Sequence, residues 1–229
     1  MNEKNGIISC IMTGLAQDSS VATKAFRRIR RWGPGRVFVP RDLLDQGDRG
    51  AVDVALHRLV ATDKIRRLGR GVYDYPKNHP RLGQLTPSTD EIARAIARST
   101  RETVVFSDAT AANMLGLSTQ VPARPVYLTN GASRTLRVGN LTIRFKHVAP
   151  SRMIGRDTKP GLVLRALRFL GRDGIVNGAI AHLRSILSDA DRRSLRALRP
   201  DAPSWMQPIL DSIVNIDSDG RASDASRDG

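Results

Sequence analysis

The chain has 229 residues, 40% of them hydrophobic, which is enough for one large domain or two small domains with real cores. Its formal net charge is +15 and its isoelectric point is near 11.2, so we expect a polyanionic partner, with a generic basic surface as the alternative. A disulfide framework is excluded because Cys10 is the only cysteine. The apolar stretch near Met12 is too short and too polar for a signal peptide or a membrane span. We therefore expect a cytoplasmic protein that does not contact membranes.

The basic residues fall into two separate segments. Residues 1–78 carry 15 Lys and Arg against 8 Asp and Glu, and the stretch from Arg124 to Arg172 carries 11 basic residues against one acid. Prolines at positions 76, 80 and 87 discourage a continuous helix between these segments and indicate a domain boundary. We therefore expect a flexible N-terminus over residues 1–20, a first domain over 21–78, a second domain over 79–215 and a disordered tail over 216–229.

The first domain begins with a basic amphipathic helix over residues 21–32. Its apolar face contains two alanines, a phenylalanine and an isoleucine, and Gly33 ends it. A short β-rich run, RVFVP, follows, and then a brief helix that Asp42 starts and Gly47 stops. The face of the first helix opposite its apolar residues carries Lys24, Arg27, Arg28 and Arg31.

A longer helix is expected over residues 49–62, with Asp48 as its N-cap. Helical spacing directs five apolar residues between positions 52 and 60 inward. The stretches KIRRL and VYDYP alternate like strands around Gly69-Arg70-Gly71, a turn in which two residues tolerate a positive φ. The outward face of the longer helix carries Gly50, Val54, His57 and Arg58.

The order helix, short strand, short helix, longer helix, β-hairpin is typical of a winged helix-turn-helix. A helix of roughly 10 Å diameter fits a major groove about 12 Å wide, and the hairpin beside it reaches phosphates or the neighbouring minor groove. We expect base contacts from the longer helix and phosphate contacts from the hairpin and the first helix. The candidate DNA-binding residues are Arg27, Arg28, Arg31, Arg49, Val54, His57, Arg58, Arg66, Arg67 and Arg70.

These features also have plainer interpretations. His57 is compatible with an ordinary surface histidine, and Arg58 is compatible with an ion pair to Asp53 or Asp63. The hairpin is compatible with a cap on a small core, and some winged domains bind proteins instead of DNA. DNA binding is favoured because the basic stripe of the first helix and the hairpin arginines agree in sign.

The second domain combines strands and helices. Ser88 and Glu91 form a capping box before a helix, TVVFSD and RPVYLTNG predict strands, and Gly116 ends a short helix between them. Gly139-Asn140 predicts a two-residue hairpin with an apolar face and a basic face. Further helices are expected at about 159–170, 174–187, 189–198 and 204–215. The expected fold class is therefore α+β, a winged helix-turn-helix followed by a larger mixed domain with C-terminal helices.

One side of this second domain is expected to be basic. The hairpin contributes three cations to it, and the helix over 159–170 contributes two arginines opposite its leucines and valine. The alternative is that these are ordinary solvated faces. The residues of the expected basic face are Arg137, Arg144, Lys146, Arg165 and Arg168.

The sequence contains no pattern that predicts catalysis. It has no phosphate-binding glycine loop, no HExxH and no cysteine pair for zinc, and its four histidines are scattered. Ser107-Asp108 is interpreted as a helix cap. We therefore expect a protein that is not an enzyme and that needs neither a metal nor another cofactor.

At AANMLGLSTQVPARPVYLTNG the sequence resembles the AbiEi-type antitoxins of bacterial toxin–antitoxin pairs, together with ALHRLVATDKIRRLGRGVYDYPK and TPSTDEIARAIA. The resemblance covers about residues 22–150 and is fainter to about 215. It implies a winged helix-turn-helix that binds inverted repeats in the promoter of its own operon and represses it. It also implies a second domain with a positively charged face that counteracts a nucleotidyltransferase-like toxin. The chain departs from the family in the shortness of its second domain.

The resulting hypothesis is a sequence-specific double-stranded DNA-binding antitoxin, acting as a monomer or a weak dimer that binds cooperatively. Its second expected partner is the toxin or the nucleic-acid substrate of that toxin. The alternative is a stand-alone winged-helix transcriptional regulator whose second domain is an interaction module without antitoxin activity.

Overall fold

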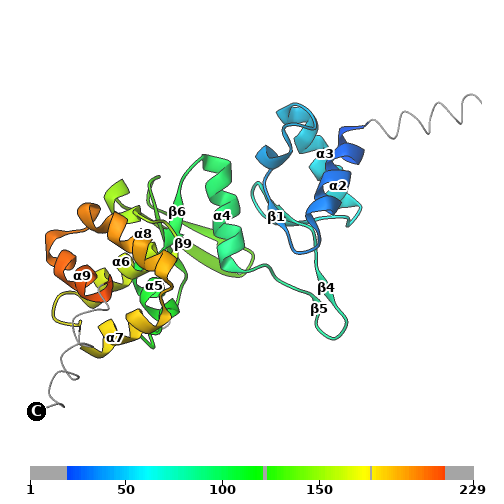
Figure 1. Ribbon diagram of the computed structural model, residues 1–229. Coiled ribbons are helices and arrows are strands. Elements are labelled where there is room, and N and C mark those ends of the chain that lie inside the picture. Colours follow the sequence, from blue (N-terminus) through cyan, green and yellow to red (C-terminus); the bar gives the residue numbers. More distant parts are fainter. Residues whose placement is uncertain (1–19, 121–122, 176, 215–229) are drawn as a thin grey trace, which may run out of the picture. The chain divides into compact units, whose positions relative to one another are not determined.

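The computed structural model describes residues 20–120, 123–175 and 177–214, and it has the predicted α+β fold (Figure 1). The predictions for the N-terminus, including Cys10 and Met12, and for the tail over 216–229 concern residues outside this description. The chain forms two compact units. One comprises the described residues up to Glu102 together with Leu136–Ile143, and the other comprises Thr103–Thr135 together with the described residues from Arg144 onward.

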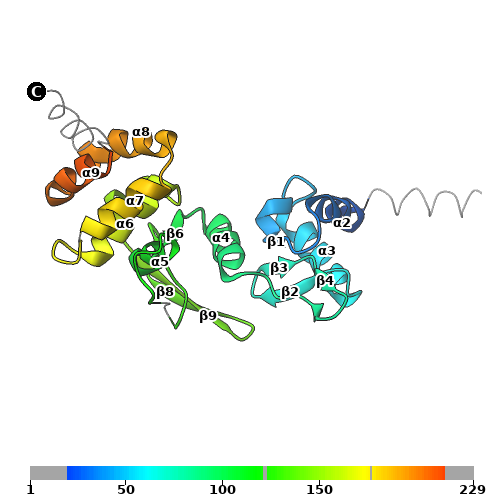
Figure 2. The ribbon, with the colours of Figure 1, turned by 60° about the horizontal axis from the view of Figure 1, so that its bottom comes forward.

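The first unit has the arrangement of a winged helix, as predicted. Its three strands form an antiparallel sheet in the order β1-β3-β2, and β2 and β3 lie side by side in Figure 2. The short second helix begins at Pro40 and not at Asp42, whose side chain instead accepts a hydrogen bond from the Val39 backbone N–H at 3.1 Å. The elements are α2 (Val21–Trp32), β1 (Val37–Phe38), the 3₁₀ helix η1 (Pro40–Leu43), α3 (Arg49–Ala61), β2 (Arg66–Gly69) and β3 (Val72–Asp74).

Side-chain caps fix where α2 and α3 begin. The Ser20 hydroxyl accepts a hydrogen bond from the Thr23 backbone N–H at 3.2 Å, and the Asp48 carboxylate accepts one from Ala51 at 2.9 Å. The apolar stripes of the two helices then pack against each other and against Phe38 of β1. Figure 1 shows α2 and α3 next to each other. The fully buried residues of this core are Ala25, Ile29, Phe38, Leu43, Val52 and Leu56.

The unit continues past the expected boundary at residue 78. A hairpin of β4 (Asn78–His79) and β5 (Gly83–Gln84) follows β3, and then comes α4 (Thr89–Thr100). Arg98 of α4 donates to the Asp42 carboxylate and, at 3.0 Å, to the Val37 carbonyl. The prolines therefore shape a hairpin within the first unit, and the compact units do not divide at residue 78.

The strands and the hairpin predicted for the second domain form one four-stranded sheet in the order β6-β7-β9-β8. The strand β6 runs antiparallel to β7, whereas β7 and β9 are parallel, with Val126 opposite Arg144. The predicted hairpin turn lies between β8 and β9, where Gly139 has a φ of 57°. The elements are β6 (Val104–Phe106), α5 (Asp108–Met114), β7 (Val126–Thr129), β8 (Arg134–Val138), β9 (Leu141–His147) and the 3₁₀ helix η2 (Pro150–Met153).

Helices build the main core of the second unit. Leucines at 167, 183 and 195 are fully buried between helices, and Ala111 and Ala112 of α5 pack among them. All four predicted C-terminal helices are present, although the last begins with a 3₁₀ turn. They are α6 (Lys159–Leu170), α7 (Asn177–Ile186), α8 (Asp189–Leu198) and α9 (Gln207–Val214), with the 3₁₀ helices η3 (Arg199–Asp201) and η4 (Ser204–Met206) before α9.

Candidate nucleic-acid interface

The outer side of α3 is exposed, as its helical spacing predicts. Val54 is 52% exposed, and His57 and Arg58 lie one turn further along the same side. Val52, Ala55 and Leu56 point into the core and fix the helix in place. The helix therefore offers a methyl-bearing side chain, an imidazole and a guanidinium, a set that can contact base edges in a major groove.

The two arginines of α3 differ in their surroundings. The Arg49 Nε donates to the Asp53 carboxylate at 2.8 Å, and both side chains remain about half exposed. Arg58 is exposed, and its side chain has no ion pair or hydrogen bond within the described residues, so the alternative in which it pairs with Asp53 or Asp63 is not observed. Arg58 is therefore the freer cation for contact with a partner.

The β2–β3 hairpin carries two exposed arginines at its turn. Gly71 adopts a φ of 69°, and a register irregularity lies between Arg67 and Gly69. The Arg67 Nε donates weakly to the Gly69 carbonyl at 3.4 Å, and the Arg70 side chain is exposed without such a contact in the described chain. Both guanidinium groups are accessible to phosphate oxygens.

Arg66 has a different role from the one expected. Its guanidinium donates to both carboxylate oxygens of Asp74, at 3.0 and 2.6 Å, and Asp74 is completely buried. A further hydrogen bond of 2.9 Å goes to the Leu85 carbonyl. The hydrogen bond to Asp74 raises the pKa of Arg66, so the guanidinium stays charged. Because its donors already serve a buried acid, we do not include Arg66 among the cations proposed to contact DNA phosphates.

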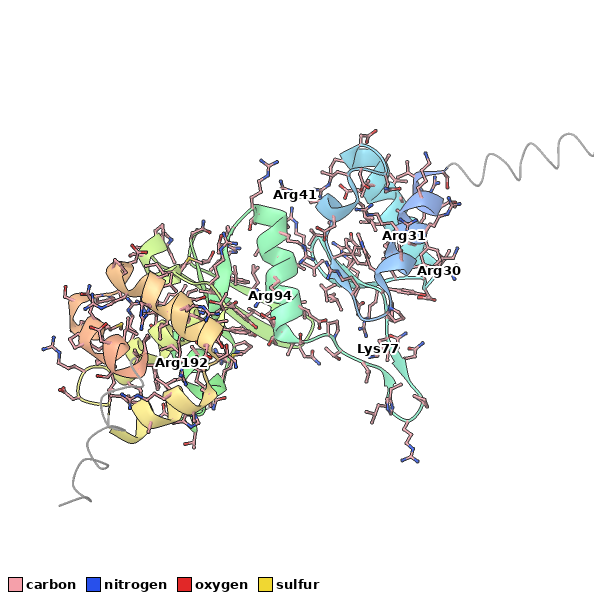
Figure 3. All side chains as sticks on the ribbon, in the orientation of Figure 1. Arg30, Arg31, Arg41, Lys77, Arg94 and Arg192 are labelled. Atoms are coloured by element: carbon pink, nitrogen blue, oxygen red, sulfur yellow. The ribbon has the colours of Figure 1, made fainter. Side chains whose placement is uncertain are left out.

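The basic side of α2 is largely exposed. Arg27 and Arg31 lie on it as predicted, and Arg30, which the sequence interpretation left out, is exposed beside them (Figure 3). Arg28 instead pairs with Asp45 at 2.9 Å and places its guanidinium 5.5 Å from the ring centroid of Trp32.

An open groove of ≈ 490 Å³ runs along this side of α2. Its apolar lining includes Phe26 and Leu59, and the Lys64 ammonium lies 5.4 Å from the centre of the Phe26 ring. Arg27, Arg30 and Arg31 line the groove, together with Ala22 and Thr23. No local sequence pattern indicates this groove, because it depends on how α2 packs beside the end of α3.

Three of the five residues of the expected second basic face are exposed. Arg137 lies on β8, and Arg144 and Lys146 alternate along β9. Arg168 of α6 is partly buried. Desolvation is the larger cause that lowers its pKa, and the positive charge of Arg152 is the second cause.

Arg165 does not belong to that face. It is completely buried and donates to the Asp157 carboxylate at 2.9 Å and to the Arg156 carbonyl. Desolvation lowers its pKa, and the charge of Asp157 opposes this effect. Helical spacing placed Arg165 outside, but the loop that carries Asp157 covers this part of α6.

Nothing in the described ranges suggests a metal centre or a membrane span. No group of three or more His, Cys, Asp or Glu residues there is arranged to hold a metal ion. No helix among the described residues is long and apolar enough to cross a membrane. Ser107 caps α5 by accepting a hydrogen bond from Thr110, as expected.

Comparison with known proteins identifies the family of the chain. No curated protein matches it. A solved structure, the crystal structure of RV2827C protein from Mycobacterium tuberculosis, is 16% identical in sequence, with 84% of this chain and 77% of that chain covered and a TM-score of 0.38. A family model matches residues 24–195, three quarters of the chain, and the chain therefore belongs to DUF6088, a family of unknown function.

Proposed function

We propose that the protein is a sequence-specific double-stranded DNA-binding repressor of its own operon, of the AbiEi antitoxin type. The observation that carries the DNA-binding part is the exposed side of α3, with Val54, His57 and Arg58, beside a hairpin with two accessible arginines. Such an arrangement suits a helix in a major groove with phosphate contacts beside it.

Charge supports the same proposal. The chain carries a net charge of +15, and the exposed arginines of α2, α3 and the β2–β3 hairpin add to the attraction of a phosphate backbone. The proposed phosphate contacts are Arg67 and Arg70, with Arg27, Arg30 and Arg31 as further cations. The proposed base contacts are Arg49, Val54, His57 and Arg58. No metal, cofactor or catalytic step is required.

A gel-shift titration tests the DNA-binding part. The probe is the duplex directly upstream of the protein's own gene, measured at several salt concentrations against a scrambled duplex. Arg67→Ala combined with Arg70→Ala should weaken binding to both duplexes and reduce the salt slope by about 2. Arg58→Ala should reduce the preference for the upstream duplex, by up to about 1–3 kcal/mol of discrimination.

The matched control is Arg193→Ala, which removes an exposed arginine from α8. It should leave both the affinity and the preference unchanged. Equal affinity of the wild type for every duplex, together with unaffected α3 variants, would refute sequence-specific repression.

The antitoxin part rests on the resemblance of LGLSTQVPA and its surroundings to AbiEi-type antitoxins, and on the exposed cations of β9. These cations suit an acidic surface of a nucleotidyltransferase-like toxin or the nucleic acid on which it acts. Co-expression of the full chain with the toxin encoded beside it should restore growth. Arg144→Ala with Lys146→Ala should lose this protection, whereas the Arg67/Arg70 variant should keep it.

The alternative function is that of a stand-alone regulator with an interaction module as its second unit. The burial of two residues of the expected basic face favours this alternative, because Arg165 is completely buried and Arg168 is partly buried. Co-expression decides between the two: a full chain that represses its promoter but never restores growth supports the regulator without antitoxin activity.

A further inference from the structure

The hairpin of β4 and β5, here called the arm (residues 77–84), has no role in the function proposed above. All of its residues are exposed, and Leu82 near its tip is 73% exposed, the highest value among the exposed large hydrophobic residues of the described chain. Figure 1 shows the arm extending away from α2, α3 and β1. A two-stranded hairpin alone is only marginally stable in water, so an arm of this kind needs internal and external support.

Hydrogen bonds hold the arm in one shape. The strands pair Asn78 with Gln84 and His79 with Gly83. The Nδ1 atom of His79 accepts hydrogen bonds from the backbone N–H groups of Arg81 at 3.2 Å and Leu82 at 3.3 Å. Gly83 adopts a φ of 68°, which closes the turn. The Arg81 and Leu82 side chains are therefore presented on a fixed backbone.

Arg66 joins the base of the arm to the winged-helix sheet. Its guanidinium, already bound to the buried Asp74, donates to the Leu85 carbonyl at 2.9 Å and lies 3.5 Å from the Gln84 side-chain oxygen. The Leu85 backbone N–H donates to the Lys77 carbonyl at 2.8 Å, which closes the base, where Figure 3 shows Lys77. Arg66 of β2 thus makes hydrogen bonds both to β3 and to the base of the arm.

The arm and the β2–β3 turn leave this sheet at opposite ends. Val72 begins β3 beside the turn, and Asp74 ends it opposite Arg66, the first residue of β2. The chain enters the arm from that second end. A major groove is bordered by a minor groove on each side, so a helix in the major groove with a hairpin at each end of its sheet suits contacts on both sides.

The chemistry of the tip fits a minor groove. Arg81 is the cation near the tip and Lys77 is the cation at the base, and residues 76–87 contain no acid. Arginine is attracted into the negative potential of a narrow minor groove, and exposed leucines serve as wedges between base steps in proteins that bend DNA. On the basis of the DNA binding proposed above, we propose that the arm is a second wing that inserts Arg81 and Leu82 into the minor groove beside the site of α3.

The test uses the full chain and duplexes that the wild-type protein selects from a random library. Binding is measured by titration, and hydroxyl-radical footprints and methylation at adenine N3 report on the minor groove. Arg81→Ala and Leu82→Ala should each weaken binding roughly 10-fold and remove minor-groove protection on one flank only. Arg81→Ala should also reduce the salt slope by about 1, whereas Leu82→Ala should leave the slope unchanged.

The matched controls are Leu44→Ala, which shortens another exposed leucine of the same unit, and Arg193→Ala. Both should bind as the wild type does. If the tip variants bind with wild-type affinity and footprint while Arg58→Ala loses preference, the second wing is wrong and the proposed DNA binding stands. If the wild type selects no duplex, both fail. If Leu82→Ala changes only the dependence of binding on protein concentration, the tip contacts a second copy of the protein and the inference is overturned.

Discussion

Replacement of Arg66 by alanine separates a structural arginine from a DNA-contacting one. Asp74 is completely buried, and its two carboxylate oxygens accept hydrogen bonds from Arg66. Removal of the guanidinium leaves a buried carboxylate without its partner, a change that costs about 3–5 kcal/mol in buried pairs. The Arg66 side chain is 29% exposed, so water reaches part of the site. We therefore expect the free energy of unfolding to fall by an amount near the lower limit, about 3 kcal/mol.

The assay is thermal and urea unfolding of the full chain, followed by DNA titration of the folded protein. A loss of 1 kcal/mol lowers the Tm of a domain of 60–100 residues by about 4–8 °C, so Arg66→Ala should lower the transition of the winged-helix unit by about 12 °C or more. Arg67→Ala is the matched control, because it is the exposed neighbour. It should keep the Tm and reduce the salt slope of DNA binding by about 1.

The opposite pattern would refute this assignment. If Arg66→Ala unfolds at the wild-type temperature and loses as much DNA affinity as Arg67→Ala, then Arg66 acts on phosphate and not on Asp74. A double variant, Arg66→Met with Asp74→Leu, adds a second check. It removes both charges and should recover most of the lost stability, because apolar replacements of buried ion pairs are often neutral or stabilising.

Three further changes test other parts of the structure. Asp48→Ala removes the N-cap of α3 and should lower the free energy of unfolding by about 1 kcal/mol in urea titrations. Arg165→Ala leaves Asp157 without its buried partner and should destabilise the second unit by about 3 kcal/mol without changing DNA affinity. Hydrogen bonds from Ser188 lower the pKa of Asp191 in the folded protein. They therefore stabilise the fold at pH values above the unfolded-state pKa, and this stabilisation is lost as the pH falls through the folded-state pKa. Ser188→Ala should raise the pKa of Asp191 in a carboxyl NMR titration.

Several helix starts and turns were predictable because local patterns determine them. The caps Ser88 and Asp48 and the turn at Gly139 lie where the sequence placed them. The apolar stripe of α3 also faces the core as its spacing required. Each of these features depends on residues within a few positions of one another, so the sequence alone contains the necessary information.

The surroundings of individual arginines were not predictable in the same way. Arg66 and Arg67 are neighbours on a strand, and alternation says only that they point to opposite sides. Arg66 becomes structural because the buried Asp74 lies opposite it across the sheet, a pairing between segments that no local pattern reveals. Arg165 is buried for a comparable reason, because Asp157 reaches it from the loop before α6.

These ion pairs decide which positive charges can serve a polyanion. In the first unit, Arg66 and Arg98 are held by the acids Asp74 and Asp42, so they contribute to the fold and little to an outward field. Arg58, Arg70 and Arg81 have no acid within ion-pair distance in the described chain, and they lie on α3, on the β2–β3 turn and on the arm. These unpaired cations are the ones that the proposed DNA binding uses, because a guanidinium without a protein acid beside it keeps its full charge for a phosphate contact.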